Sequence, residues 1–140
     1  DDGMFEGLRI ATNRHVIVAA PDHLLARQQQ IALRDLGSET WLVREEASGT
    51  RRLVDEYLAG AHIVPSKTTI GSNSAVAAAA MVGLGIGVVP LVAVEHQIVA
   101  GTLVQLDVVP SPPSRDWFAL LPVRRPSPAA RVLADFLTQR

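Results

Sequence analysis

The chain has 140 residues, of which 48% are hydrophobic and 19% are charged. This balance is typical of a globular chain that is long enough for one domain with a core or for two small lobes, and it excludes a disordered chain. The formal net charge is -1, so we do not expect the chain by itself to bind DNA strongly. There is no cysteine, which excludes disulfides and thiolate metal sites.

Neither the first residues nor the most apolar segment predicts a membrane or export signal. Residues 1–3 read DDG, and no positive segment with an apolar run follows them, so we expect no signal peptide. Residues 75–94 carry few charges, but Gly83, Gly85, Gly87 and Pro90 interrupt them, which favours buried core over a membrane helix. The chain starts without methionine and runs straight into sheet-like sequence, so we expect an excised piece of a longer protein.

Apolar runs and turn residues predict alternating strands and helices. In the first half we expect an edge strand at residues 8–10, a strand at 15–20, helical turns at 24–28 and 32–36, and a strand at 40–43. A helix then begins after Ser48, and its apolar stripe comprises Leu53, Val54, Tyr57, Leu58 and Ala61.

The second half continues the alternation. We expect a strand at residues 67–71, a helix at 75–82, a central parallel strand at 86–90, a helix at 91–100, a strand at 102–109, a linker at 110–114, a strand at 116–123 and a last helix that starts at Ser127. The helix at 75–82 is apolar on nearly every side, which predicts that it is sandwiched in a core. In the last helix the apolar stripe is Val132, Leu133, Phe136 and Leu137.

This order predicts an α/β fold with a largely parallel sheet. In such sheets ligands bind outside the carboxyl ends of the strands. Two serine-rich helix starts, at residues 48–50 and 72–74, would both lie at that edge. Two helix N-termini at one edge favour an anion site more than either would alone.

The candidate ligand-binding residues come from these two helix starts. Ser48, Gly49 and Thr50 would offer backbone N–H groups and hydroxyls, and Arg51 or Arg52 could add positive charge. Ser72 and Asn73 are candidates from the second helix start.

An ordinary structural interpretation stays open for the same residues. Serine, glycine and threonine before a helix are commonly only a cap. Arg51 with Asp55 and Arg52 with Glu56 have the i,i+4 spacing of ion pairs on a solvent face.

Other patterns do not predict catalytic or metal chemistry. The run GLGIG at residues 83–87 follows a helix and opens a strand, the reverse of a dinucleotide-binding loop, so we interpret it as a tight turn with close backbone packing. The four histidines lack ligand spacing. Glu45 and Glu46 are adjacent and read as a solvated loop, and Trp41 and Trp117 read as core. No nucleophile–base set is visible, so we expect no enzyme, metal or cofactor.

Several runs, in this order and spacing, resemble one family. They are REEASGTR at residues 44–51, GSNSAV at 71–76, GLGIGVVP at 83–90 and GTLV at 101–104, with APDHLLA at 20–26 and SPAAR at 127–131 in agreement. Together they resemble the effector-binding domain of LysR-type transcriptional regulators, over almost the whole chain.

The resemblance implies two Rossmann-like lobes of the type II periplasmic-binding-protein kind. Lobe II would be complete at residues 20–106, and lobe I would be partial at 1–19 and 107–140. A small-molecule effector, with an anionic metabolite as our expectation, would bind in the interlobe cleft and shift the state of a DNA-bound oligomer. The resemblance assigns Ser48, Gly49, Thr50 and Arg51 to the lobe II wall.

The resemblance also fixes the expected partners. DNA would be bound only through a missing N-terminal helix-turn-helix domain, the protein would be cytoplasmic and no membrane would be contacted. We expect self-association as a dimer or tetramer of the full-length protein, since an incomplete lobe I sheet would expose a strand edge. The alternatives are a solute-binding protein of a transport system with the same fold and a fragment whose role is only structural.

Overall fold

The computed structural model describes residues 4–124 and 127–138, and its chain divides into two compact units. Unit 1 comprises Asp1–Asn13 and Ser114–Arg140, and unit 2 comprises Arg14–Pro113. These boundaries fall at 13/14 and 113/114, several residues outside the lobe boundaries that we expected at 19/20 and 106/107. The assignment of the units to lobes remains a prediction.

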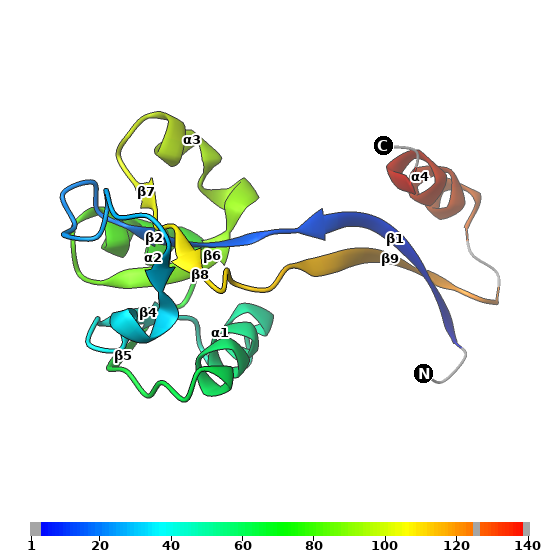
Figure 1. Cartoon of the computed structure of the whole chain (residues 1–140). Helices are drawn as coiled ribbons and strands as arrows, with labels where there is room; N and C mark the ends of the chain where they lie inside the picture. The colour runs from blue at the N-terminus through cyan, green and yellow to red at the C-terminus, as the bar shows by residue number, and fades with distance from the viewer. Residues whose placement is uncertain (1–3, 125–126, 139–140) are drawn as a thin grey trace. The chain divides into compact units, whose positions relative to one another are not determined.

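Unit 2 is built on a five-stranded sheet in the order β5-β4-β6-β2-β7 (Figure 1). The strands are β2 (His15–Ala19), β4 (Trp41–Val43), β5 (Lys67–Thr69), β6 (Ile86–Pro90) and β7 (Val104–Gln105). β4 is parallel to β5 and β6, but β2 is antiparallel to β6 and β7. The expected α/β class is confirmed, whereas the largely parallel sheet is wrong, because a strand buried on both faces is apolar in either direction.

Apolar clusters cover both faces of this sheet, although its edge strand β5 is exposed. On β2, Ile17 and Ala19 join one apolar cluster, and Val16 and Val18 join the other, as the period of two in a strand requires. The first cluster includes Leu53, Val54 and Leu58 of α1 (Gly49–Gly60) together with η1 (Leu33–Leu36). The second includes Val76, Ala77 and Ala80 of α2 (Asn73–Met81).

Trp41 is fully buried in the first cluster, as predicted. Its indole Nε1 donates a hydrogen bond of 3.0 Å to the carbonyl oxygen of Leu36, which satisfies the one polar atom that burial of this side chain would otherwise leave unpaired. Trp41 therefore fixes η1 against the start of β4, the strand that leads to α1.

The expectation that α2 is sandwiched is wrong. Only Val76, Ala77 and Ala80 are buried, while Val82 and Leu84 just beyond the helix are exposed. α2 therefore covers the sheet with one face. Alanine has little side-chain surface to bury, so a run of alanines tolerates an exposed side that a run of leucines would not.

The glycine turn after α2 has the predicted character. Gly83 has φ of 78°, in the left-handed region, and a Cβ on Gly85 would lie 2.3 Å from the carbonyl oxygen of Thr40. Ile86 donates its N–H to that same oxygen at 2.9 Å. The turn brings β6 against β4, so it is a packing device.

Three predicted elements differ in the structure. Residues 24–28 form hydrogen-bonded turns and not a helix, with Ala26 N–H donating to His23 at 2.9 Å. Residues 91–100 divide into η2 (Leu91–Ala93) and the short α3 (Glu95–Val99). Residues 102–109 divide into β7 and β8 (Val108–Val109), and β8 pairs with β3 (Ile31–Ala32) in a separate parallel ladder.

Unit 1 contains a two-stranded antiparallel ribbon of β1 (Phe5–Asn13) and β9 (Arg115–Pro122), contacted by α4 (Pro128–Thr138). β1 is longer than the edge strand expected at residues 8–10. The Ser127 hydroxyl accepts the Ala130 N–H at 3.1 Å, which confirms the predicted cap.

The prediction that Trp117 is core is wrong, and most of the apolar stripe of α4 is exposed. Trp117 is 45% exposed, and Val132, Leu133 and Phe136 of the α4 stripe are exposed too. In the described part of unit 1 the ribbon and one helix are the only layers, which is too little structure to bury every apolar face.

Among the described residues, no helix is both long and apolar enough to cross a membrane.

Candidate functional site

The predicted site lies where β4 and β5 end and the next helices begin. Val43, the last residue of β4, is paired with Thr69, the last residue of β5. α1 begins at Gly49 after the first strand, and α2 begins at Asn73 after the second. Because the two strands are parallel and in register, both helix starts follow the same edge of the sheet, as the sequence predicted.

The start of α1 lacks a side-chain cap. Ser48 has the extended backbone of an N-cap residue, φ -75° and ψ 135°, and its carbonyl oxygen accepts the first helical bond from Arg52 N–H at 3.2 Å. Its hydroxyl makes no capping hydrogen bond, and the first turn carries no acidic side chain. The positive end of the α1 dipole is therefore not neutralised by a side chain of its own first turn.

The start of α2 is capped internally. The Ser72 hydroxyl accepts the Ala75 N–H at 3.1 Å. The side-chain oxygen of Asn73 accepts a hydrogen bond of 3.1 Å from Arg44 Nη1. Ser72 and Asn73 thus make contacts that hold the local structure together, whereas the N-cap hydroxyl of α1 makes no capping bond.

Arg44, which the sequence analysis did not single out, links the two helix starts. Its guanidinium donates to both carboxylate oxygens of Glu45, from Nε at 2.8 Å and from Nη2 at 2.7 Å, besides the bond to Asn73. The Arg44 side chain is only 18% exposed. The available signal was its position immediately after a fully buried strand, at the carboxyl edge.

The Arg44–Glu45 contact favours the charged form of both partners. The hydrogen bond with Arg44 is the main cause that lowers the pKa of Glu45, and the hydrogen bond with Glu45 is the main cause that raises the pKa of Arg44. The expectation of a simply solvated Glu45 is wrong, because the guanidinium of Arg44 binds its carboxylate. Glu46 is exposed, as expected.

Arg51 is committed to the fold. Its Nε donates to Asp55 Oδ2 at 2.8 Å and its Nη1 to the carbonyl oxygen of Arg44 at 3.0 Å. The predicted i,i+4 pair exists, but it is not on a solvent face, since the Arg51 side chain is only 16% exposed. Lys67 Nζ also contacts Asp55, at 2.6 Å. The pair Arg52–Glu56 remains a prediction.

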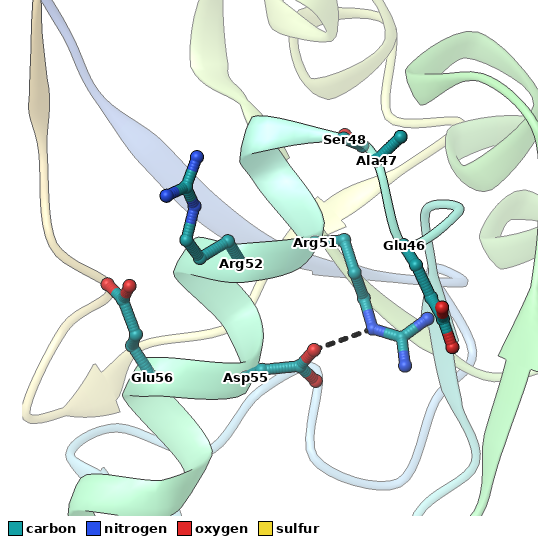
Figure 2. A pocket seen from close by; sticks show the side chains of 7 residues that line it. All are labelled: Glu46, Ala47, Ser48, Arg51, Arg52, Asp55 and Glu56. Carbon is teal, nitrogen blue, oxygen red and sulfur yellow. Dashed lines mark hydrogen bonds and ion pairs between the residues drawn. The ribbon is translucent and has the colours of Figure 1, made fainter.

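A concavity of about 440 Å³ lies beside the start of α1 (Figure 2). Of the predicted site residues, Ser48 and Arg51 line it, and Gly49, Thr50, Ser72 and Asn73 do not. Its lining residues are Glu46, Ala47, Ser48, Arg51, Arg52, Asp55 and Glu56. Figure 2 shows the Arg51–Asp55 ion pair within it, so the cationic end of Arg51 is already neutralised on this side.

The side chains near the site do not form a metal centre. Within residues 4–124 and 127–138, no group of three or more His, Asp or Glu side chains could hold a metal ion. The local chemistry combines N–H donors, hydroxyls and guanidinium groups, which bind oxyanions, with the carboxylates of Glu46, Asp55 and Glu56 in the lining of the concavity.

The sheet, its helices on both faces and the second unit define an α/β ligand-binding domain with the type II periplasmic-binding-protein-like fold. The chain belongs to the family of LysR substrate binding domains, whose model matches residues 1–140. The resemblance described from the sequence is thereby confirmed.

Individual relatives agree with this family. The HTH-type transcriptional regulator CbbR of Cereibacter sphaeroides is 40% identical over 119 residues, which are 83% of this chain and 38% of that protein. CbbR of Rhodospirillum rubrum is 34% identical over 130 residues, which are 91% of this chain and 43% of that protein. The chain thus spans about two fifths of the length of these curated relatives.

A solved structure shows the same fold. The regulatory domain of CcmR from Synechocystis PCC6803, in complex with 2-PG, matches with a TM-score of 0.86 and 25% identity over 99% of this chain and 68% of that chain. The relatives are transcriptional regulators, so the comparisons do not favour a solute-binding protein of a transport system.

Proposed function

We propose that this chain is the effector-sensing domain of a LysR-type regulator and that it binds an anionic small molecule at the start of α1. The observation that carries the proposal is the N-cap Ser48 of α1, whose side chain makes no capping hydrogen bond at the carboxyl edge of the sheet. An oxyanion there would accept hydrogen bonds from the first-turn amides and interact favourably with the helix dipole.

Two hydroxyls support the amides. The Ser48 side chain makes no cap, and within the described residues we find no hydrogen bond from the side chain of Thr50. Both residues are only partly exposed, so a ligand that they bind would be partly removed from water. We assign Ser48, Gly49 and Thr50 to the ligand and Arg51 to the support of the loop.

The proposed partners follow from the family. CcmR, with which this chain shares its fold, binds 2-PG, and we take 2-PG as the first probe. The relatives are HTH-type regulators, so we propose that DNA is bound by a separate helix-turn-helix domain, that the full-length protein self-associates and that it acts in the cytoplasm. We propose no enzymatic activity, since the relatives are regulators.

Thermal unfolding of this chain with 2-PG, inorganic phosphate, sulfate and small carboxylates tests the proposal. A ligand at 100 times its Kd should stabilise the domain by about 2.7 kcal/mol. Thr50→Val should reduce that stabilisation, because it removes the hydroxyl and keeps the shape of the side chain. Thr68→Val, at an exposed position of β5, is the matched control and should leave it unchanged. Equal stabilisation of wild type and Thr50→Val would refute the role of Thr50.

A further inference from the structure

At the edge of the sheet where we propose that the effector binds, the guanidinium of Arg44 binds the carboxylate of Glu45, the next residue in the chain. We call this two-pronged guanidinium the Arg44 fork. Both oxygens of Glu45 are engaged, at 2.8 and 2.7 Å. This is the bidentate arrangement with which arginine binds carboxylate and phosphate groups.

The two partners differ in how firmly they are fixed. Arg44 also donates to Asn73 at the start of α2, and its carbonyl oxygen accepts a bond of 3.0 Å from Arg51. The Glu45 side chain is 44% exposed, against 18% for Arg44. Within the described part of the chain, the carboxylate of Glu45 is held by the side chain of Arg44 and by the backbone N–H of Glu45 itself. Rotation of the Glu45 side chain would therefore release the fork without disturbing a helix or a strand.

We propose that Glu45 is an internal competitor of the effector: its carboxylate occupies the Arg44 guanidinium, and an oxyanion of the effector binds by taking its place. The inference rests on the proposed function and deepens it, since it names Arg44 as the residue that selects the ligand and Glu45 as the group that tunes affinity.

The competing ligand must match the fork. A planar carboxylate or a phosphoryl group presents two oxygens to two N–H groups, whereas a neutral hydroxyl compound cannot replace a carboxylate ion there. Because Glu45 is partly solvated, its contact with Arg44 is worth little more than an exposed ion pair, so the penalty that the competitor imposes on binding is modest.

Titration calorimetry with 2-PG and with inorganic phosphate, at fixed ionic strength, tests the exchange. Glu45→Gln removes the competing charge and should tighten binding about two- to fivefold, the range expected for an exposed ion pair. Glu95→Gln removes one negative charge from α3, and binding should not change. Arg44→Lys keeps the charge but lacks the fork, and it should weaken binding.

The double variant Arg44→Lys with Glu45→Gln separates exchange from a general charge effect. If Glu45 acts by occupying the Arg44 guanidinium, Glu45→Gln should not increase the affinity for the probe in the Arg44→Lys background. An increase in affinity that persists there would overturn the exchange. Urea unfolding of each variant without ligand shows whether it is folded.

The outcomes for the exchange and for the proposed function are distinguishable. If wild type binds a probe and Glu45→Gln binds it no more tightly, the exchange is overturned. The proposed site at the start of α1 is then not affected. No binding of either probe by wild type and by Glu45→Gln would overturn both.

Discussion

Tyr57 of α1 donates a hydrogen bond of 2.5 Å from its phenol to the carbonyl oxygen of Pro110. The two residues are 53 positions apart in the chain, and Pro110 lies close to Pro113, where unit 2 ends. The bond therefore ties the helix that begins at the proposed effector site to the segment through which the chain leaves the unit. Tyr57 was expected only as a member of the apolar stripe, and its phenol adds a polar role to that position.

Tyr57→Phe should lower the free energy of unfolding by about 0.5–1.5 kcal/mol, since it removes one hydrogen bond and retains the ring. Burial raises the pKa of Tyr57 above its ordinary value of 10.0. A group whose pKa is raised by folding contributes fully below its unfolded pKa and loses that contribution as the pH rises above it. Urea unfolding at pH 8 and at about pH 11 should therefore show wild type losing more stability than Tyr57→Phe; an equal loss would contradict the partly buried, hydrogen-bonded phenol.

Gly87 is required by the packing of α2 on the sheet. A Cβ at this position would lie 2.5 Å from Val76 Cγ1 and 3.3 Å from the carbonyl oxygen of Leu42. Val76 is buried and β-branched, so it cannot rotate away freely. Gly87→Ala should destabilise unit 2 by roughly 1–3 kcal/mol, the usual cost of overpacking.

Two variants control for Gly87→Ala in the same thermal unfolding measurement. Gly60→Ala should be close to neutral, because a Cβ there meets nothing within 4 Å. In a Val76→Ala background, Gly87→Ala should cost less than in wild type, since the clashing methyl group is absent. Strict additivity of the two changes would show that the contact with Val76 is not the cause.

The chain between β4 and α2 was largely predictable because its signals are local. A buried apolar strand, a serine at the N-cap position and a stripe with a period of 3.6 residues place α1 at the observed residues, Gly49–Gly60. The capping bond of Ser72 is likewise a contact over three residues. Such features depend on residues that are close in the sequence, so they can be predicted from the local sequence pattern.

Other features depend on partners far away in sequence. The direction of β2 is set by its pairing with β6 and β7, and its apolar run would suit either direction. Trp117 lies on a two-stranded ribbon. Its exposure depends on which elements pack against that ribbon, and the apolar residues next to it in the sequence do not show this. Arg44 acquires its role from Asn73, which is 29 positions away, and no single-residue signal identifies that contact.

Asp55 joins α1 to β5, because it accepts hydrogen bonds from Arg51 at 2.8 Å and from Lys67 at 2.6 Å. Burial by itself would raise the pKa of Asp55, but the hydrogen bonds from Lys67 and Arg51 outweigh it and leave the pKa below the ordinary 3.8. A carboxylate with a lowered pKa contributes stability above its unfolded pKa and loses it as the pH falls through the folded one.

Asp55→Asn should therefore destabilise the domain at pH 7 and have a smaller effect at about pH 3. The loss at pH 7 should be near 1 kcal/mol, since the Asp55 side chain is 40% exposed and water screens both ion pairs. Urea unfolding at the two pH values measures it. If Asp55→Asn lowered the free energy of unfolding equally at both pH values, the loss would come from the shape of the side chain and not from its charge.

The two serines at the helix starts should respond differently to alanine. Ser72→Ala removes a capping bond of 3.1 Å and should lower the free energy of unfolding by about 1 kcal/mol. The Ser48 hydroxyl makes no such bond, so Ser48→Ala should change it by only a few tenths of a kcal/mol. Without ligand, a comparison of the two by urea unfolding measures the cap alone.

The ligand-induced stabilisation by 2-PG or another bound anion should show the opposite ranking: Ser48→Ala should be affected more than Ser72→Ala. Ser48→Ala should then lose part of the ligand-induced stabilisation, because the Ser48 hydroxyl is available for the ligand. Ser72→Ala should keep that stabilisation, since its hydroxyl is occupied by Ala75 N–H. Equal stability losses for the two variants without ligand, together with equal ligand responses, would mean that Ser48 caps α1 in solution and is not a ligand donor.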